Sequence, residues 1–375
     1  MSMIVNGTRV IVAMSGGVDS TVAAYLLKEA GYEVIGATMH VRHPDKDFPS
    51  HTPGGRCGCC GVSSVEDARR IAQQLRIPFS VLDLRKQFDR EVISYFCEEY
   101  LKGRTPNPCI LCNEKVKFGA LLTKAGELGA PFISTGHYAR VEYDPARGRY
   151  LLKRGKDAKK DQSYVLFSLS QDQLSHALFP LGCSRKADVR KKARDVGLTV
   201  HDRPESQEIC FIPGTDYRSF LRRRAARGIE AGDIVDTHGR VLGRHEGLPF
   251  YTIGQRRGLG LSAGKPLYVV GFDRGRNLVI VGEKREVCGG KLIANRVNWI
   301  AIEELHHPIA VKAKIRSTHR EADAVVAPSE DGAVKVEFAQ PQEAITPGQA
   351  VVFYDGDVVM GGGWIDRAIR GRETS

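Results

Sequence analysis

The sequence lacks the features that would direct it into or across a membrane. No stretch of about 18 apolar residues is present, so a membrane-spanning helix is not expected. Met1–Val10 lacks the apolar core of a secretory signal, which predicts a cytoplasmic protein. Internal repeats and low-complexity tails are also missing. Without an export signal, the nine cysteines are not expected to form structural disulfides, so they direct attention to catalysis or metal binding.

The composition is that of a globular protein with an excess of positive charge. Hydrophobic residues make up 42% and charged residues 26% of the 375 residues, enough for two or three domains with their own cores. Lysine and arginine exceed aspartate and glutamate by 11. This excess favours a polyanionic partner such as nucleic acid, although a solvated basic surface explains the same number.

The most informative stretch is a strand, a glycine turn and a helix near the amino end. Arg9–Met14 is an apolar run, Ser15-Gly16-Gly17 interrupts it, and Ser20–Ala30 has apolar residues at helical spacing. Such a turn lets backbone N–H groups approach an anion, and the helix N-terminus adds donors and partial positive charge. The pattern predicts a phosphate site.

The side chains of this turn suggest which phosphate compound binds. Ser15 and Ser20 offer hydroxyl donors, whereas Asp19 makes sense beside a phosphate if Mg²⁺ lies between them. The Walker A signature is absent, because no Gly-Lys-Ser/Thr follows the glycines. Ser15-Gly-Gly-Val-Asp-Ser20 instead resembles the PP-loop of ATP pyrophosphatases. That resemblance implies that ATP is split between its α and β phosphates to adenylate a substrate oxygen.

Strands and helices alternate through the first half of the chain. Further strands are predicted at Glu33–His40, Phe79–Leu84 and Phe132–Thr135, and helices from Ser63, over Phe88–Leu101, from Asn113 to Gly129, and over Ser170–Leu178 and Lys186–Val196. This alternation predicts an α/β fold, a doubly wound parallel sheet with ligands at the carboxyl ends of its strands.

The second half has a different texture. A hairpin is predicted at Val141–Tyr143 and Tyr150–Lys153, and beyond Pro204 the helical pattern is mostly lost. Short strands predict a small closed β-barrel; they fall at Leu267–Val270, Leu278–Val281, Ala310–Ile315, Ala333–Phe338 and Ala350–Phe353. We therefore expect a catalytic domain over 1–205, a central linker domain over 206–265 and a C-terminal β-barrel over 266–375.

Three cysteines occupy positions that suit chemistry. Cys109 and Cys112 follow a proline-rich turn just before a predicted helix, where the helix N-terminus stabilises a thiolate. Cys210 lies in a loop-like stretch with a polar lead-in, although an apolar packing role is the alternative. Cys57, Cys59 and Cys60 lie close together in a glycine-rich loop, where zinc binding, sulfur transfer and incidental thiols all remain open.

Six motifs in order along nearly the whole chain resemble the tRNA-specific 2-thiouridylase family. They are the Ser15 loop, Thr105-Pro-Asn-Pro-Cys-Ile-Leu-Cys-Asn113, Thr135-Gly-His-Tyr138, Lys160-Asp-Gln-Ser-Tyr164, Gln207–Gly214 and Thr252-Ile-Gly-Gln-Arg-Arg-Gly-Leu-Gly260. The resemblance implies a sulfurtransferase that adenylates the C2 oxygen of the wobble uridine (U34) and replaces it with sulfur, releasing AMP and pyrophosphate. Its partners would be the anticodon stem-loop of tRNA and a protein sulfur donor.

The resemblance also implies residue roles. Cys210 would carry the sulfur as a persulfide, and Cys112 would attack or resolve it, leaving a disulfide that must be reduced. The residues that would contact ATP are Ala13, Met14, Ser15, Gly16, Gly17, Val18, Asp19, Ser20, Met39 and Gly136. Those that would contact tRNA are Asn107, Pro108, Cys109, His137, Lys160, Asp161, Gln162, Arg316 and Gln349.

One position departs from the family pattern. Cys109 stands where many members have an aspartate thought to assist proton transfer, and a thiol has a much higher ordinary pKa than a carboxyl group. Cys109, Cys112 and Cys210 therefore also suit a 4Fe-4S cluster whose open iron holds the sulfur, as in related thiolases. The persulfide and the cluster remain alternatives here.

Two rival functions share some of these features. A ligase that adenylates a small acid would use the PP-loop but has no use for Cys112 and Cys210. A non-catalytic RNA-binding protein would explain the charge and the barrel but not the phosphate loop. AMP release that depends on tRNA would separate thiolation from both.

Overall fold

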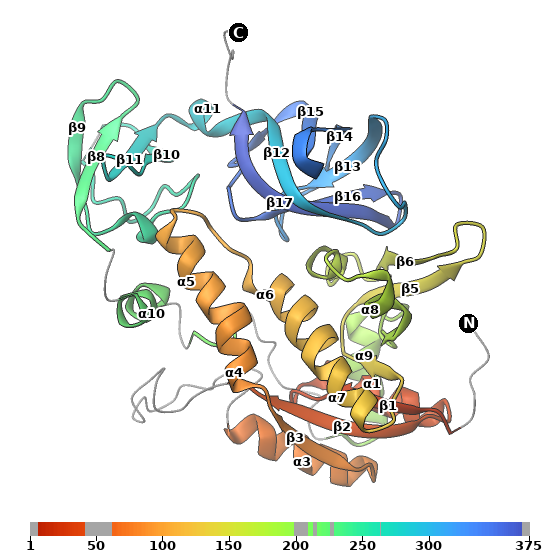
Figure 1. The fold of residues 1–375 in the computed structure, drawn as a ribbon. Coiled ribbons are helices and arrows are strands. Elements are labelled where there is room, and N and C mark those ends of the chain that lie inside the picture. Colours follow the sequence, from red (N-terminus) through yellow and green to blue (C-terminus); the bar gives the residue numbers. More distant parts are fainter. Residues whose placement is uncertain are drawn as a thin grey trace. The chain divides into compact units, whose positions relative to one another are not determined.

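A computed structural model describes residues 7–41, 62–198, 209–212, 216–225, 229–262 and 264–369 (Figure 1). The chain forms two compact units. The first unit contains residues 1–93, 108–216 and 357–359, and the second contains 94–107, 217–356 and 360–375. Cys57, Cys59 and Cys60, with both ends of the Gln207–Gly214 motif, lie outside the described residues.

The first unit is built on a five-stranded sheet whose paired strands are parallel, in the order β3-β2-β1-β4-β7. The strands are β1 (Arg9–Ala13), β2 (Glu33–His40), β3 (Phe79–Asp83), β4 (Phe132–Ser134) and β7 (Ala177–Leu178). The predicted α/β class with a doubly wound parallel sheet is confirmed. The strand order reverses between β1 and β4, which is where ligands bind in such sheets.

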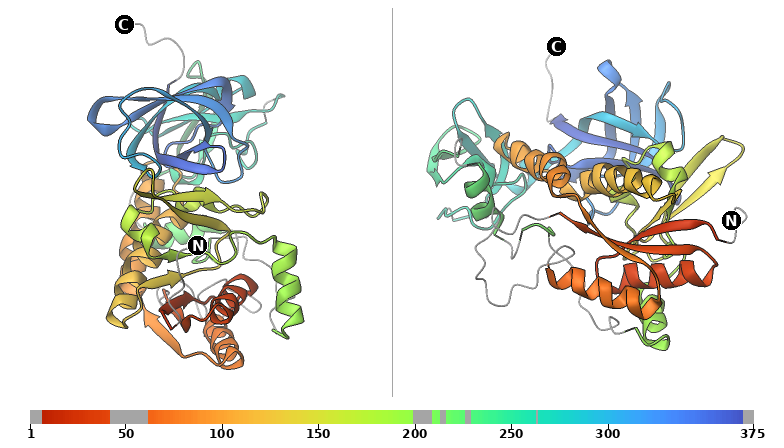
Figure 2. Two further views of the ribbon diagram at one scale, coloured as in Figure 1. Left: turned by 90° about the vertical axis from the view of Figure 1, so that its right-hand side faces the viewer. Right: turned by 60° about the horizontal axis from the view of Figure 1, so that its bottom comes forward.

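Helices cover both faces of this sheet (Figure 2). Helices α1 (Val18–Glu29), α3 (Val62–Leu75) and α9 (Lys186–Asp195) pack on one face, and α7 (Leu121–Glu127) contacts β4 from the other. The first face buries Val10, Val12, Val22, Ile71 and Val189, among others. This burial removes a large apolar area from water and holds the β1–α1 turn at the carboxyl end of the central strand β1.

Shorter elements complete the first unit. They are α4 (Arg85–Phe88), the π-helix η1 (Asp89–Ile93), α6 (Pro108–Leu111), the π-helix η2 (Cys112–Ala120), β5 (Ala139–Asp144), β6 (Arg149–Arg154), the 3₁₀ turn η3 (Ser163–Leu166) and α8 (Gln171–Ser175). The hairpin prediction is confirmed by the antiparallel pairing of β5 and β6. The helix predicted over Ser170–Leu178 is shorter, because Ala177 and Leu178 pair with β4 instead.

One part of the second unit combines helices with a four-stranded sheet. The helices are α5 (Ser94–Leu101) and α10 (Tyr217–Arg224), with the 3₁₀ turn η4 (Leu248–Phe250). The strands β8 (Gly232–Asp236), β9 (Val241–His245), β10 (Tyr268–Asp273) and β11 (Leu278–Gly282) have the order β10-β11-β8-β9. The short strands at Leu267–Val270 and Leu278–Val281 thus pair with this sheet and not with the barrel.

The C-terminal strands close into a barrel. Strands β12 (Cys288–Trp299), β13 (Ile309–Lys314), β14 (Ala322–Pro328), β15 (Val334–Glu343), β16 (Ala350–Asp355) and β17 (Val358–Ile369) have the order β12-β15-β14-β13-β16-β17. β12 also pairs with β17, which closes the ring and confirms the predicted closed barrel. A short helix, α11 (Lys284–Val287), precedes β12, and the 3₁₀ turn η5 (Glu330–Gly332) precedes β15.

Two local expectations are wrong. The helix expected from Asn113 begins at Pro108, so Cys109 and Cys112 lie within helical turns and not before them. Helix α10 follows Pro204, where the helical pattern was read as lost; its triple arginine hid the apolar residues Phe220 and Leu221, both at most 1% exposed. No helix of the described ranges has both the length and the apolar character needed to cross a membrane.

Candidate active site

The turn between β1 and α1 has the backbone geometry of a phosphate-binding loop. Gly16 has φ = 73°, in the left-handed region that favours glycine. The hydroxyl of Ser20 accepts from the Ser15 N–H at 3.2 Å and donates to the Gly17 carbonyl at 3.2 Å. Thr21 Oγ1 donates to the same carbonyl at 2.8 Å. These bonds fix the loop at the N-terminus of α1, where unpaired N–H groups and the helix dipole favour an anion.

Gly136 lies against this loop. It follows β4, the strand beside β1, so it reaches the reversal point of the strand order. A Cβ built on Gly136 would lie 2.8 Å from the carbonyl carbon of Asp19 and 2.8 Å from the nitrogen of Ser20. Such distances are too short for any side chain. The structure therefore brings together two stretches that the resemblance assigned to ATP.

The other residues predicted to contact ATP line the same edge. Ala13 ends β1, and Met14 and Val18 are buried beside the turn, 2% and 4% exposed. Met39 is half-buried near the end of β2, and its neighbour Thr38 donates from Oγ1 to the Met14 carbonyl at 2.8 Å. The predicted set thus lies at the carboxyl ends of β1, β2 and β4, and its contacts with ATP stay a prediction.

Asp19 has a partner that the sequence analysis missed. Lys186, the first residue of α9, donates from Nζ to both carboxylate oxygens of Asp19 at 2.7 and 2.6 Å. The hydroxyl of Tyr138 donates to Asp19 Oδ1 at 2.7 Å. Lys186 is 8% exposed, and a lysine is rarely buried without a paired charge. The lone lysine at the start of a basic helix gave no sequence signal, because its partner is 167 residues away.

The sequence Thr135-Gly-His-Tyr138 buries its histidine. His137 is 8% exposed, its Nδ1 lies 2.7 Å from Thr135 Oγ1, and its ring packs edge-on against Phe179. Burial, and then the positive charge of Lys117, lower the pKa of His137 well below its ordinary value of 6.5. The imidazole is therefore neutral at physiological pH, and its contact with tRNA stays a prediction.

The loop containing Lys160, Asp161 and Gln162 is folded by its own side chains. Asp161 Oδ1 accepts from the N–H groups of Gly155 and Ser163 at 3.0 and 3.1 Å, and its side chain is 5% exposed. Gln162 Oε1 accepts from the Tyr138 N–H at 3.0 Å. Lys160 is half-buried. Asp161 and Gln162 thus hold the loop next to Tyr138 and the Asp19 carboxylate.

Cys109 and Cys112 lie on consecutive turns of one helix. Cys109 is exposed in the first turn of α6, and half-buried Cys112 begins the π-helix η2. π-Helical turns are rare and occur frequently at functional sites. The Gln173 amide donates to two carbonyls of η2, those of Glu114 and Phe118, both at 2.9 Å.

Cys210 lies in a turn whose neighbours do the packing. The Ile212 N–H donates to the Ile209 carbonyl at 3.0 Å, and Phe211 and Ile212 are 2% and 5% exposed. Cys210 itself is half-buried, and its role in the chemistry stays a prediction. Phe211 packs edge-on against Phe88 of α4 with ring centroids 5.6 Å apart.

The cysteine-bearing segments and the glycine loop share neighbours within the first unit. Helix α4 contacts both η2 and, through Phe88, the turn that contains Cys210. Asn113, next to Cys112, donates from Nδ2 to the Val165 carbonyl at 2.9 Å. Val165 belongs to the turn that follows Gln162. The Gln162 side chain accepts from the Tyr138 N–H, and the Tyr138 hydroxyl donates to Asp19. A continuous chain of contacts therefore links Cys112 to the glycine loop.

The three cysteines do not fit the cluster alternative. Cys109, Cys112 and Cys210 all belong to the described residues, and within those ranges the structure gathers no three Cys, His, Asp or Glu side chains that could hold a metal ion. A 4Fe-4S cluster needs its thiolates close together. No step of the chemistry below is therefore assigned to a cluster.

Three residues predicted to contact tRNA belong to the second unit. Gln349 donates from Nε2 to the Thr105 carbonyl at 2.8 Å, and Arg316 donates from Nη1 to the Glu343 carbonyl at 3.1 Å. Asn107 is half-buried at the end of the 94–107 segment, and Pro108, the first residue of α6 in the first unit, is buried. The side chains of Gln349 and Arg316 thus already bind backbone groups.

Comparisons with known proteins agree with this architecture. Residues 8–214 match the tRNA methyl transferase HUP domain family, residues 218–283 the tRNA methyl transferase PRC-barrel domain family, and residues 290–365 the aminomethyltransferase β-barrel domain family. The "tRNA-specific 2-thiouridylase MnmA 2" of Caldanaerobacter subterraneus subsp. tengcongensis is 54% identical over 362 residues, covering 96% of this chain and 99% of that protein. The chain belongs to the tRNA-specific 2-thiouridylase family.

Other members of the 2-thiouridylase family show the same full-length likeness. The "tRNA-specific 2-thiouridylase MnmA" of Heliobacterium modesticaldum is 54% identical over 360 residues, covering 96% of this chain and 92% of that protein. That of Acetivibrio thermocellus is 52% identical over 357 residues, covering 95% and 99%. A solved 4-thiouridine synthetase–RNA complex with bound ATP covers 58% of this chain and 50% of its own at 17% identity; its TM-score of 0.35 is too low to support an inference.

Proposed function

We propose that this protein is a tRNA-uridine 2-sulfurtransferase that adenylates the C2 oxygen of a wobble uridine and replaces that oxygen with sulfur. The observation that carries the proposal is the glycine loop closed by Gly136, joined through shared neighbours to a helix with two cysteines in its first turns. Family membership over nearly the whole chain supports the same substrate and reaction.

The loop would bind ATP through its backbone. The N–H groups at the start of α1 and the hydroxyls of Ser15 and Ser20 are suited to the β and γ phosphates, which leave together as pyrophosphate. Mg²⁺ is bound in proteins by one or two carboxylates together with substrate phosphates. Asp19 is the loop's carboxylate, and Lys186 would hold it in position for a metal–nucleotide complex.

Adenylation prepares the uridine for substitution. The uridine O2 would attack the α phosphate, the bond to the β phosphate would break, and pyrophosphate would leave. The base must leave its stack to reach this phosphate, as nucleotide-modifying enzymes require of their targets. The net charge of +11 fits a tRNA partner, because cationic side chains offset phosphate repulsion.

The two cysteines would then complete the exchange. A Cys210 persulfide attacks C2 with its outer sulfur, and the C2–O bond breaks to release AMP. The Cys112 thiolate attacks the inner sulfur of Cys210, which frees the 2-thiouridine and leaves a Cys112–Cys210 disulfide. An external dithiol must donate two electrons to reduce that disulfide, and a protein persulfide donor must reload Cys210. Cys109 is exposed on the same helix as Cys112, where a second thiol could exchange with this disulfide.

The division into a catalytic domain over 1–205, a linker domain and a C-terminal barrel remains part of this proposal, with the strands at Leu267–Val270 and Leu278–Val281 counted with the linker. In it the first domain would bind ATP and the target base, and the linker and barrel would hold the rest of the tRNA. The arginines in the last turn of α10 and the barrel turn near Arg316 are candidate phosphate contacts.

The test is a reconstituted reaction with ATP, tRNA and a persulfide source. We expect AMP release that depends on tRNA, and 2-thiouridine detected by mass spectrometry of the digested tRNA. RNA binding without ATP cleavage would instead support a binding protein. AMP release with a small carboxylic acid and no tRNA would support a ligase.

A further inference from the structure

The chain crosses from the first unit to the second at Ile93–Ser94 and returns at Asn107–Pro108. The returning crossing is two residues before Cys109. Residues 94–107, which we call the excursion, therefore belong with the barrel, although the cysteines that follow belong with the glycine loop. The excursion leads directly into helix α6.

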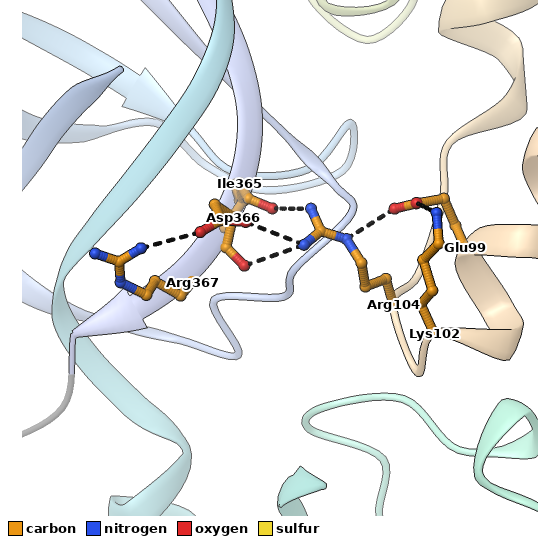
Figure 3. Close-up of polar contacts among 6 residues, drawn as sticks. All are labelled: Glu99, Lys102, Arg104, Ile365, Asp366 and Arg367. Carbon is orange, nitrogen blue, oxygen red and sulfur yellow. Dashed lines mark hydrogen bonds and ion pairs between the residues drawn. The ribbon is translucent and has the colours of Figure 1, made fainter. Parts of the chain in front are cut away.

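Arg104 fastens the end of the excursion to the barrel strand β17 (Figure 3). Its Nε donates to Glu99 Oε2 at 2.7 Å, its Nη1 to Asp366 Oδ1 at 3.2 Å, and its Nη2 to the Ile365 carbonyl at 3.0 Å. The Arg104 and Glu99 side chains are 18% and 11% exposed. Charge-assisted hydrogen bonds at such burial are stronger than neutral ones and fix the fork geometry of the guanidinium.

Thr105 is held at both of its backbone polar groups. Its N–H donates to the Pro347 carbonyl at 2.9 Å, and its carbonyl accepts from Gln349 Nε2 at 2.8 Å. Between these two partners, Gly348 has φ = 90°, and a Cβ built there would lie 2.9 Å from the Thr105 nitrogen. The barrel turn Thr346–Gln349 can pack this closely against Thr105 only because residue 348 is a glycine.

Thr105 is joined to the cysteine-bearing helix by a conformationally restricted segment. Pro106 and Pro108 frame Asn107, and each proline ring restricts its own φ and the conformation of the residue before it. Both prolines are buried. Helix α6 begins at Pro108, so Cys109 and Cys112 lie within the first turns after this connection.

We propose that Arg104 and Gln349 are positioning residues for the cysteine helix, acting through Thr105 and the Pro106–Pro108 connection. The barrel turn Thr346–Gln349 thus serves the reaction by restraining the segment that carries Cys112, and not only by contact with tRNA. The part of this inference that concerns thiolation rests on the proposed function. The restraint on Cys112 is a property of the free protein and does not depend on it.

The first arm of the test measures Cys112 alkylation by iodoacetamide in the full-length protein without ATP or tRNA, by mass spectrometry of the Cys112 peptide. A half-buried thiol reacts more often when its segment opens more often. We expect the rate at Cys112 to rise about fivefold in Gln349→Ala, which loses one hydrogen bond, and about tenfold or more in Arg104→Ala. Gly348→Ala should raise it without removing any polar group.

Two matched controls separate this effect from a general loss of charge. Lys102→Ala removes the exposed lysine that bonds Glu99 Oε1 at 3.3 Å, and Arg367→Ala removes the exposed arginine on Asp366 Oδ2 at 3.1 Å (Figure 3). Neither side chain bonds Thr105 or Arg104 in those contacts. Both controls should keep the wild-type alkylation rate, and all variants should keep the wild-type melting temperature of the barrel within a few degrees.

The second arm measures single-turnover thiolation and tRNA binding. We expect the thiolation rate to fall about fivefold in Gln349→Ala and about tenfold in Arg104→Ala, with ATP affinity unchanged in both. Alkylation within twofold of wild type in Arg104→Ala and Gln349→Ala, or a decrease, overturns the proposal. A weaker tRNA affinity with unchanged alkylation would mean that Gln349 acts by direct contact, which also overturns it. Absent thiolation in wild type, with the alkylation pattern as expected, would reject the proposed function alone.

Discussion

The glycine loop and the cysteine helix of the first unit are held in different ways. The loop is fixed by neighbours close in sequence, such as Ser15, Gly17 and Ser20, and by one glycine packed against it. The cysteine helix is fixed from a distance, by Gln173 on η2 and Val165 beside Asn113. The difference teaches that the phosphate site is local geometry, whereas the thiol site is a product of tertiary packing.

The largest effect is expected from substituting the cysteines, which should stop sulfur transfer and leave ATP binding intact. Cys112→Ser and Cys210→Ser should each lower thiolation at least about a thousandfold, because neither hydroxyl can form or resolve a persulfide. ATP binding should remain at the wild-type level, since the glycine loop uses neither thiol. Quantitative mass spectrometry of 2-thiouridine and equilibrium ATP binding measure the two quantities. Cys183→Ser, at an exposed cysteine to which no role is assigned, is the control.

A substitution at the loop should have the converse effect. A side chain at Gly136 would push against the Asp19–Ser20 backbone from 2.8 Å, so Gly136→Val should displace the phosphate donors. Displacements near 1 Å cost about a hundredfold in rate, which is the loss expected in AMP release. Gly126→Val changes a glycine whose Cβ would meet nothing within 4 Å and serves as the control. Wild-type AMP release by Gly136→Val would contradict the assignment of the loop.

Substitution of Lys186 tests whether a residue far along the sequence also supports the glycine loop. In Lys186→Met the carboxylate of Asp19 keeps only the Tyr138 hydroxyl among the bonds described above. Loss of a charged hydrogen-bond partner costs about 1.5–3 kcal/mol, so ATP affinity should fall about tenfold or more. Isothermal titration with ATP and Mg²⁺ measures it. Lys192→Met, on the same helix, should bind ATP as wild type does, and equal affinities in both variants would show that Asp19 needs no such support.

The smallest effect is on stability and involves His137. Its pKa is lowered in the folded protein, so below the ordinary value of 6.5 the unfolded chain binds a proton that the folded chain does not. The contribution is therefore complete above pH 6.5 and is lost as the pH falls, by at most about 1.4 kcal/mol per pH unit.

Thermal unfolding of wild type and His137→Asn between about pH 7.5 and 5.5 measures this contribution. The variant should lose less stability over that range than wild type. His245 and His319 also have lowered pKa values from burial, and they remain in both proteins, so the difference isolates His137. Parallel pH curves for the two proteins would contradict the buried neutral imidazole.

The sequence predicts most of the fold because its signals are local. The apolar runs at Arg9–Ala13 and Glu33–His40 and the glycines after β1 specify strands and a turn by themselves. Helix α10 was missed because three arginines lower its mean hydropathy, and Ala177–Leu178 were read as helix because only pairing with β4 makes them a strand. The pairing of β10 and β11 with β8 and β9 likewise depends on partners distant in sequence.

The candidate site was predictable in the same unequal way. Gly136 and the loop were found through motifs, whereas Lys186, Gln173 and Arg104 were not, because each acts on a partner far along the chain. The π-helical start at Cys112 also has no simple sequence signal, since the same residues fit an ordinary helix. Long-range hydrogen bonds therefore carry the part of the site that residue patterns do not reveal.

The central claim is that ATP activates the uridine oxygen that a cysteine-bound sulfur then displaces. A tRNA with ¹⁸O at C2 of the wobble uridine, incubated with the protein, ATP and a persulfide source, tests it directly. The account predicts that the released AMP carries the ¹⁸O label in proportion to the 2-thiouridine formed. Unlabelled AMP accompanying 2-thiouridine formation would contradict it.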